Sequence, residues 1–302
     1  MTRRQQNVAA SVKARLLNQS KVTQRPYHEL LQYYAMERFL YRFGLTPHAE
    51  TMALKGALML QLLGTKLIRP TKDIDVLAGE ILSEGQGRAL IEDCIAVSVM
   101  DDGILFDASS IRVEPIRREQ KYHGLRCRFF SYMENSRIAL QIDMGFGDAA
   151  IPAPVMRRFP TLLADHPAPE LLVYSIEASV SEKYEAMVSL GSTNTRFKDF
   201  FDVWFYASQH DFKGNTLQEA IRATFKRRGT ALDTRPHCFE TDFAATPVRQ
   251  TQWKAFMGNI RQSTPRFEEA TMVCRQLLLP PTEAALCEQE FTLRWQPGKG
   301  WG

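Results

Sequence analysis

The sequence predicts an α/β (α+β) protein in which a mixed β-sheet is flanked by helices and followed by a helical domain. Three patterns predict this fold class: apolar residues recur at helical spacing near the N-terminus, alternate at strand spacing in the middle, and return to helical spacing afterwards. Five prolines between residues 152 and 169 separate the last two regions. We therefore place one domain at residues 1–160 and a C-terminal helical domain at residues 161–302, ending in a flexible tail.

The N-terminal elements follow from apolar spacing and from the positions of glycines. Residues 8–17 and 27–43 have helical periodicity, and Gly44 ends the second helix. Residues 51–54 predict a short strand and residues 57–63 a compact amphipathic helix. A polar turn through residue 70 then leads into a strand that begins with two aspartates.

Between about residues 85 and 150 the apolar period shifts toward strands. Alternation is clearest at residues 111–116, 125–129 and 139–144. Helical spacing resumes at Ile176 and predicts five helices, at residues 176–190, 197–209, 217–227, 250–260 and 267–278.

Composition excludes several classes of protein. No apolar run approaches the roughly 20 residues that a membrane span needs, and no apolar signal core follows the basic N-terminus. Five cysteines at wide spacing fit neither a disulfide framework nor a zinc site, so we expect a cytoplasmic protein. The net charge of +4 permits a nucleic-acid partner without requiring one. Three basic clusters are each either solvated surface or polyanion contacts: Arg117, Arg118, Lys121, Arg126 and Arg128; Arg157 and Arg158; and Lys226, Arg227 and Arg228.

The residues that most clearly suggest metal and phosphate binding lie between Lys55 and Asp75. Asp73 and Asp75 flank one apolar residue, so on a strand they project side by side, and two such carboxylates repel each other unless a cation lies between them. Oxygen ligands favour a hard ion such as Mg²⁺. Gly56, followed by Ala57 at a strand-to-helix turn, lets a phosphate approach the backbone and the N–H groups of the helix. An isolated Asp-x-Asp is often only a polar strand end.

A third carboxylate, Asp143, interrupts a strand that otherwise looks buried. A buried carboxylate needs a partner, and a metal shared with the first two aspartates is our preferred one. The alternative is that Asp143 caps the loop leading to Gly145.

Two later helical segments carry a further group of charges. Lys183 is either a surface ion-pair residue or a point charge that grips a triphosphate. Asp199 and Asp202 lie three residues apart and share a helix face, where either could cap the helix or hold Lys183 or Arg196. The residues alone do not decide between these interpretations.

Four segments in order resemble the AbiEii/AbiGii toxin family, a branch of the polymerase-beta-like nucleotidyltransferases. The segments are LKGAL at residues 54–58, RPTKDID at 69–75, EKYEAM at 182–187 and RFKDFFD at 196–202. The resemblance spans roughly residues 10 to 210 and also includes ERFLYRF at residues 37–43. It implies a nucleotidyltransferase α/β core with a C-terminal helical domain.

The resemblance also implies an activity and a setting. The reaction would be Mg²⁺-dependent transfer of a nucleotide from an NTP to an acceptor, for characterised relatives the 3′ end of tRNA. The setting would be the toxin of a bacterial type IV toxin–antitoxin or abortive-infection pair, with a separate antitoxin encoded nearby.

The resemblance implies a role for each motif residue. Asp73 and Asp75 match the catalytic, metal-binding pair, and Asp143 matches the third carboxylate. The nucleotide-binding set would comprise Lys55, Gly56, Ala57, Lys183, Asp199 and Asp202, with Lys183 also catalytic. One departure is Ala57, where the wider superfamily usually has a serine whose hydroxyl contacts phosphate. The alternatives to a transferase are a metal-dependent nuclease and a non-catalytic protein that binds RNA or a partner.

Overall fold

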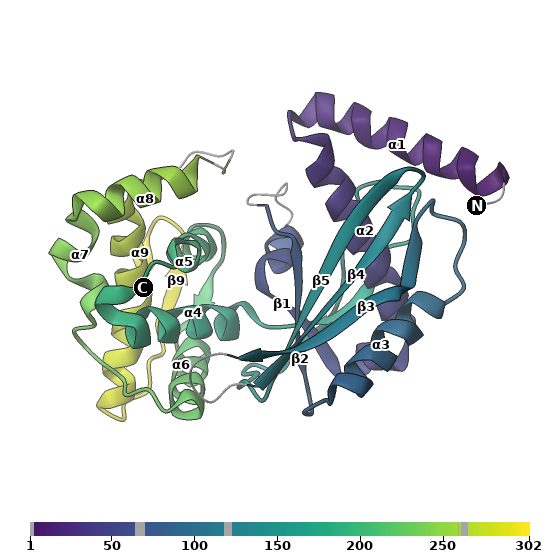
Figure 1. Ribbon diagram of the computed structural model, residues 1–302. Coiled ribbons are helices and arrows are strands. Elements are labelled where there is room, and N and C mark those ends of the chain that lie inside the picture. The colour runs from purple at the N-terminus through teal and green to yellow at the C-terminus, as the bar shows by residue number, and fades with distance from the viewer. Residues whose placement is uncertain (1–2, 64–69, 118–122, 259, 261–264) are drawn as a thin grey trace. The chain divides into compact units, whose positions relative to one another are not determined.

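The computed structural model describes residues 3–63, 70–117, 123–258, 260 and 265–302. The chain forms two compact units (Figure 1): unit 1 comprises Met1–Gly147 and Val155–Val173, and unit 2 comprises Asp148–Pro154 and Tyr174–Gly302. The domain boundary placed after residue 160 therefore falls inside a segment of unit 1. The predicted polar turn before residue 70, together with Arg118 and Lys121, lies outside the described residues.

Unit 1 is built on a seven-stranded mixed sheet in the order β3-β4-β5-β2-β1-β7-β6. Strands β3, β4 and β5 form an antiparallel meander, β5 runs parallel to β2, β2 is antiparallel to β1, and β1 is parallel to β7. The predicted mixed sheet is thereby confirmed, with the alternating segments inside its three longest strands. The strands are β1 (Met52–Lys55), β2 (Asp73–Ala78), β3 (Leu105–Arg117), β4 (His123–Met133), β5 (Ser136–Phe146), β6 (Val155–Arg158) and β7 (Glu170–Val173).

Helices α2 and α3 pack on one face of this sheet. Phe39 of α2 contacts Phe129 of β4, with ring centroids 5.4 Å apart. Gly87 of α3 lies so close to Leu125 of β4 that an added Cβ would be 2.9 Å from its side chain. Because Leu125 and Phe129 are four residues apart on a strand, both point to the same, helix-covered face. The helices of unit 1 are α1 (Arg3–Thr23), α2 (Tyr27–Gly44), α3 (Glu84–Ala96) and the 3-10 helices η1 (Pro47–Glu50) and η2 (Gly56–Leu63).

Two elements of unit 1 differ from the sequence-based prediction. Helix α3 lies where strand periodicity was expected to begin, and Ser83 starts it with a capping box in which its hydroxyl accepts from the N–H of Gln86. The helix predicted as amphipathic at residues 57–63 is present, but as the 3-10 helix Gly56–Leu63. Its residues are apolar on almost every side, so no amphipathic stripe favours the α-helical period there.

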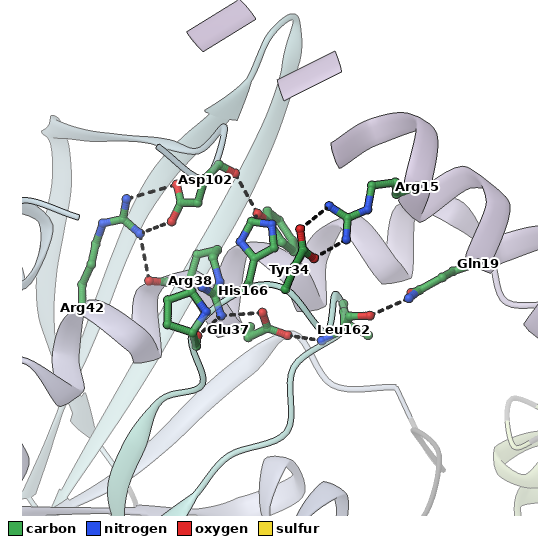
Figure 2. Close-up of polar contacts among 11 residues, drawn as sticks. Arg15, Gln19, Tyr34, Glu37, Arg38, Arg42, Asp102, Leu162 and His166 are labelled. Atoms are coloured by element: carbon green, nitrogen blue, oxygen red, sulfur yellow. Dashed lines mark hydrogen bonds and ion pairs between the residues drawn. The ribbon is translucent and has the colours of Figure 1, made fainter. Parts of the chain in front are cut away.

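A buried cluster of charges fixes α2 to the loops around it (Figure 2). Arg42 donates to both oxygens of Asp102 at 2.6 and 3.2 Å, and the Tyr34 hydroxyl donates to the backbone carbonyl of Asp102 at 2.7 Å. Both members of the Arg42–Asp102 pair are less than a tenth exposed. A buried pair of this kind is strongly destabilised when one partner is removed, because the other charge remains in the core.

Glu37 and Arg38 form the second half of this cluster. Arg38 Nη2 donates to Glu37 Oε1 at 2.7 Å and to the carbonyl of Pro167 at 2.9 Å, while Glu37 Oε2 accepts from the N–H of Leu162 at 2.6 Å. Burial raises the pKa of Glu37 from its ordinary value of 4.5 to about 7, against the opposing charge of Arg38. Helix α1 joins the same loop through Arg15, which pairs with Asp165.

Unit 2 is mainly helical, as predicted, and has an aromatic core. Phe267 stacks on Trp253 with centroids 4.9 Å apart and meets Phe197 and Phe200 edge-to-face at 5.2 and 5.3 Å. Helices α4 and α5 have the predicted bounds. The helices are α4 (Ile176–Leu190), α5 (Phe197–Gln209), α6 (Gly214–Arg228), α7 (Thr241–Ala245), α8 (Pro247–Met257) and α9 (Phe267–Leu286), with 3-10 turns η3 (Gly191–Thr193) and η4 (His237–Phe239).

The C-terminal tail corrects a prediction, because it is part of a small sheet and not a flexible end. Strands β8 (Phe212–Lys213), β9 (Arg294–Gln296) and β10 (Gly300–Trp301) form this antiparallel sheet. Trp295 is buried and donates to the carbonyl of Ala207 at 2.7 Å, and Trp301 donates to the carbonyl of Gln276 at 3.0 Å. Two indoles therefore fasten the tail to the helices. Within the described residues, no helix combines the length and the apolar composition that crossing a bilayer requires.

Glu37→Gln should remove a pH dependence of stability. Because the pKa of Glu37 is raised in the folded state, the native chain binds more protons than the unfolded chain between pH 4.5 and about 7, and the free energy of unfolding falls as pH rises through this window. At about 1.4 kcal/mol per tenfold change in proton affinity, the contribution is roughly 3 kcal/mol. Urea denaturation followed by circular dichroism near both ends of the window measures it.

The matched control is Glu92→Gln, which neutralises a half-buried carboxylate paired with Arg88. This variant should keep the pH dependence of the wild type. An unchanged pH dependence in Glu37→Gln would show that Glu37 does not titrate in this range.

Candidate functional site

Two adjacent strands of unit 1 carry the three aspartates that the sequence analysis selects. Strands β2 and β5 are paired in register, so that Asp75 lies opposite Asp143 and Asp73 lies opposite Gln141. Ile74, between the two aspartates of β2, is fully buried on the other face of the sheet. The three carboxylates therefore project from one face of the sheet. Asp73 and Asp75 are two residues apart on β2, and Asp143 is on the neighbouring strand β5. All three residues are half-buried.

Gly56 brings the backbone after β1 against one of these carboxylates. Lys55, the last residue of β1, pairs with Asp75, and Gly56 has a φ of +75°. A Cβ at Gly56 would lie 2.0 Å from Asp75 Oδ2, so any side chain there would displace the carboxylate. The predicted approach of a phosphate to Gly56 stays a prediction, and the contact with Asp75 is an independent reason for glycine. Lys55 is half-buried, and Ala57 is buried within η2.

Asp143 has a protein partner, Arg126 of β4, which lies directly opposite it on the neighbouring strand. Arg126 Nε donates to Oδ1 at 2.8 Å and Nη2 donates to Oδ2 at 2.7 Å, a two-point contact between guanidinium and carboxylate. The hydrogen bond to Asp143 is the main reason why the pKa of Arg126 is raised, and the charge of Asp73 adds to it. Arg126 was expected to be either a solvated surface charge or a polyanion contact, and the structure brings it to the predicted carboxylate site.

The donor chemistry of the three aspartates fits a magnesium ion. Carboxylate oxygens are hard ligands, and the shared sheet face gives them a common direction. Within the described residues, however, no three carboxylate, histidine or cysteine side chains already converge on one point where an ion could bind. Both oxygens of Asp143 accept from Arg126, so coordination by all three carboxylates requires at least this side chain to rearrange. The need of Asp143 for a partner is met by Arg126, and its metal-binding role stays a prediction.

Unit 2 brings together the second group of predicted residues, on α4 and α5. Lys183 Nζ lies 2.9 Å from Asp202 Oδ2 and 3.6 Å from Asp199 Oδ1. The second oxygen of Asp199 accepts from Arg196 Nε at 2.6 Å. The side chains of Asp199 and Asp202 are almost completely buried, while that of Lys183 is 13% exposed. Both acids thus hold Lys183, and Asp199 is shared with Arg196.

Local sequence signals place these three side chains. Ser175 caps α4, its hydroxyl accepting from the N–H of Ala178 at 3.1 Å, and Gly191 ends the helix with a positive φ. Asn194 then accepts from the N–H of Arg196 at 2.8 Å, immediately before α5 begins. The spacing of three residues sets Asp199 and Asp202 on the α5 face toward Lys183.

Arg228 is a structural residue that the sequence analysis did not identify. Its cluster was expected to be solvated surface or a polyanion contact, but the side chain is only 12% exposed and contacts Glu185 at 2.8 Å and both Asp148 and Glu182 at 3.2 Å. Burial lowers the pKa of Arg228, but the charges of Glu182 and Asp148 outweigh that effect and leave the pKa above its ordinary value. No local motif marks this pairing, because its partners come from distant segments.

Comparison with known proteins gives one family. The sequence model described as "Nucleotidyl transferase AbiEii toxin, Type IV TA system" matches residues 38–273. No curated protein matches the sequence.

Three solved structures resemble the fold. MenT4, a nucleotidyltransferase toxin from Mycobacterium tuberculosis H37Rv, aligns with a TM-score of 0.56 and 16% identity over 92% of this chain and 93% of its own. JHP933 and a putative nucleotidyltransferase, both from Helicobacter pylori, align at 16% identity over 86% of this chain, covering 92% and 95% of their own, with TM-scores of 0.46 and 0.47. The MenT4 alignment shows a shared fold over nearly the whole length of both chains.

Gly56→Ala should destabilise the protein by roughly 2 kcal/mol or more, because the positive φ and the overlap with Asp75 both act against a side chain. Gly85→Ala is the control: an added Cβ there meets nothing within 4 Å, in the first turn of α3, so the change should stabilise by a few tenths to about 1 kcal/mol. Urea denaturation measures both. Equal stabilities for the two variants would contradict the close contact.

Proposed function

Because the chain belongs to the AbiEii family of nucleotidyltransferase toxins, we propose that it transfers a nucleotide from an NTP to the 3′ end of an RNA, with magnesium as the cofactor. The chain is accordingly an enzyme, a nucleotidyltransferase, and the family is that of type IV toxin–antitoxin systems. The observation that supports the proposed chemistry best is the in-register pairing of β2 with β5, which sets Asp75 opposite Asp143 on one face.

In the proposed reaction, the terminal hydroxyl of the acceptor attacks the α-phosphorus of the NTP. A bond forms between that hydroxyl oxygen and phosphorus, the bond to the bridging oxygen of the β-phosphate breaks, and pyrophosphate leaves. Asp73, Asp75 and Asp143 would hold magnesium, whose positive charge neutralises the phosphate oxygens. An oxygen of Asp143 accepts the proton of the attacking hydroxyl once it is no longer bonded to Arg126.

Lys183 is the proposed point charge for the triphosphate. Its contacts with the buried Asp199 and Asp202 support this role, because two carboxylates hold the ammonium in a fixed place. Lys55, Gly56 and Ala57 would contact the nucleotide from the turn after β1. Ala57 has no hydroxyl, so any contact from this position comes from its backbone N–H.

The biological setting is proposed from the family. The acceptor would be tRNA, whose blocked 3′ end would stop translation, and the chain would act in the cytoplasm beside an antitoxin that restrains it. The match to a type IV toxin family supports the antitoxin partner.

Asp75→Asn should abolish transfer of label from an NTP to RNA, because it removes a charge needed at the metal while keeping the shape of the side chain. The assay is incubation of purified protein with magnesium, each labelled NTP in turn and total bacterial tRNA, followed by gel analysis. Asp93→Asn, at an exposed carboxylate paired with His48, should retain wild-type activity. Labelled RNA formed equally by Asp75→Asn would refute the assignment, and RNA cleaved without NTP would indicate a nuclease.

Asp202→Asn should raise the KM for NTP more than Asp199→Asn does. Asp202 is the closer partner of Lys183, at 2.9 Å against 3.6 Å, and Asp199 is held in addition by Arg196. The measurement is KM for NTP at saturating RNA, alongside thermal unfolding to show that each variant is folded. An unchanged KM in a folded Asp202→Asn variant would remove Lys183 from the triphosphate site.

A further inference from the structure

One face of the sheet in unit 1 forms a surface that starts at the predicted catalytic carboxylates. Along β4 the buried residues Leu125, Cys127 and Phe129 face the helices, so the residues between them, Arg126 and Arg128, face the other way. The same alternation holds for β5, where the side chains of this outward face are half-buried or exposed. We call the outward side chains of β3, β4 and β5 the open sheet face.

The open sheet face is basic. Four arginines belong to it, Arg112, Arg126, Arg128 and Arg137, against three acids on these strands, Asp107, Glu114 and Asp143. Arg112, Arg128 and Arg137 are exposed. Four guanidinium groups against three carboxylates leave a net positive charge, and guanidinium groups are well suited to phosphate oxygens.

The basic side chains alternate with an aromatic one. Phe130 follows Arg128 on the same face of β4, and it lies opposite Ala139, an exposed residue with a small side chain. The Arg137 guanidinium lies 4.7 Å from the centroid of the Phe130 ring. Arginines beside a partly exposed aromatic ring are a combination that binds single-stranded nucleic acid, since phosphates pair with the charges and bases stack on the ring.

Strand register connects this surface to the carboxylates. Every second residue of β5 lies on the open sheet face, from Asp143 through Gln141 and Ala139 to Arg137. This face therefore runs about 20 Å along the strand away from Asp143. Arg128 of β4 lies between the Asp143 end and the Arg137 end of this face, and it donates to Gln141 at 3.0 Å and to Glu114 at 2.6 Å. A single strand lying along β5 would therefore have one end at the carboxylates.

We propose that the open sheet face binds the single-stranded 3′ segment of the acceptor RNA, with its terminal hydroxyl at Asp143. This inference rests on the proposed function, since only a nucleotide acceptor needs a free hydroxyl at that position. Arg128 and Arg137 contact the sugar–phosphate backbone, and Phe130 stacks with a base. A polyanion matches the positive charge of the surface better than a protein partner with mixed charge.

The test uses the double variant Arg128→Gln/Arg137→Gln in the full chain. Its matched control is Arg157→Gln/Arg158→Gln, which removes two charges from exposed residues of β6 at the other edge of the sheet. The probe is a short unstructured RNA ending in a 3′ hydroxyl, and binding is measured without NTP, so that the result does not depend on catalysis. The KM for the same RNA is measured separately with labelled NTP.

The double variant Arg128→Gln/Arg137→Gln, called the face variant below, should bind the RNA about tenfold more weakly. The salt dependence of its binding should be shallower by about one phosphate contact per arginine. Phe130→Ala should weaken binding without changing the salt dependence, because stacking carries no charge. The control variant should bind as the wild type does. In the transfer assay, the face variant should show a raised KM for RNA and an unchanged KM for NTP.

Equal RNA binding by the face variant and the wild type would overturn the proposal, as would an equal loss in the control variant. Failure of the wild-type protein to bind the RNA would also overturn it, and would favour a protein partner for this surface. If only the proposed function is wrong, the result differs: RNA binding would still depend on Arg128 and Arg137, but no nucleotide from an NTP would be added to the RNA.

Discussion

The parallel pairing of β2 with β5 is the constraint on which the carboxylate site depends. Ile74 and Ile142 are paired and buried on the helix-covered face, so the register of these strands is fixed by the core and not by the aspartates. A slip of one residue would turn Asp75 into the core and Ile74 outward, exchanging buried apolar surface for a buried charge. The same packing that stabilises unit 1 therefore positions Asp75 opposite Asp143.

The carboxylate site also contains a positive charge, that of Arg126. Asp75 and Asp143 are paired across β2 and β5, and Arg126 brings a positive charge to them by bonding to both oxygens of Asp143. A cation bound by the aspartates would compete with Arg126 for the same oxygens, so the arginine would become available to another anion as the metal binds. Strand β4 thus links the proposed metal site to the basic residues beyond it. The proposed catalytic and RNA-binding surfaces therefore share the hairpin formed by β4 and β5.

Sequence patterns predicted the fold well wherever a periodic apolar stripe sets one side of an element against the core. The predicted bounds of α4 and α5 match the structure. Helix α3 was missed because its first five residues include two glycines and no apolar side chain, which weakens the helical period; the Ser83 and Gln86 capping box was its clearer signal. The aspartates were found from their spacing along one strand. Their partner Arg126 depends on hairpin register, which is set by a two-residue loop after Met133 that no apolar pattern reveals. The ordered tail depends on contacts of Trp295 and Trp301 with residues distant in sequence.

The aromatic core of unit 2 has an optical consequence. All four tryptophans of the chain, Trp204, Trp253, Trp295 and Trp301, belong to unit 2. Intrinsic tryptophan emission therefore reports on this unit alone, whereas circular dichroism records the backbone of both. Comparison of the two signals during denaturation separates the unfolding of the helical unit from that of the sheet unit in the intact chain, with no added label and no truncation.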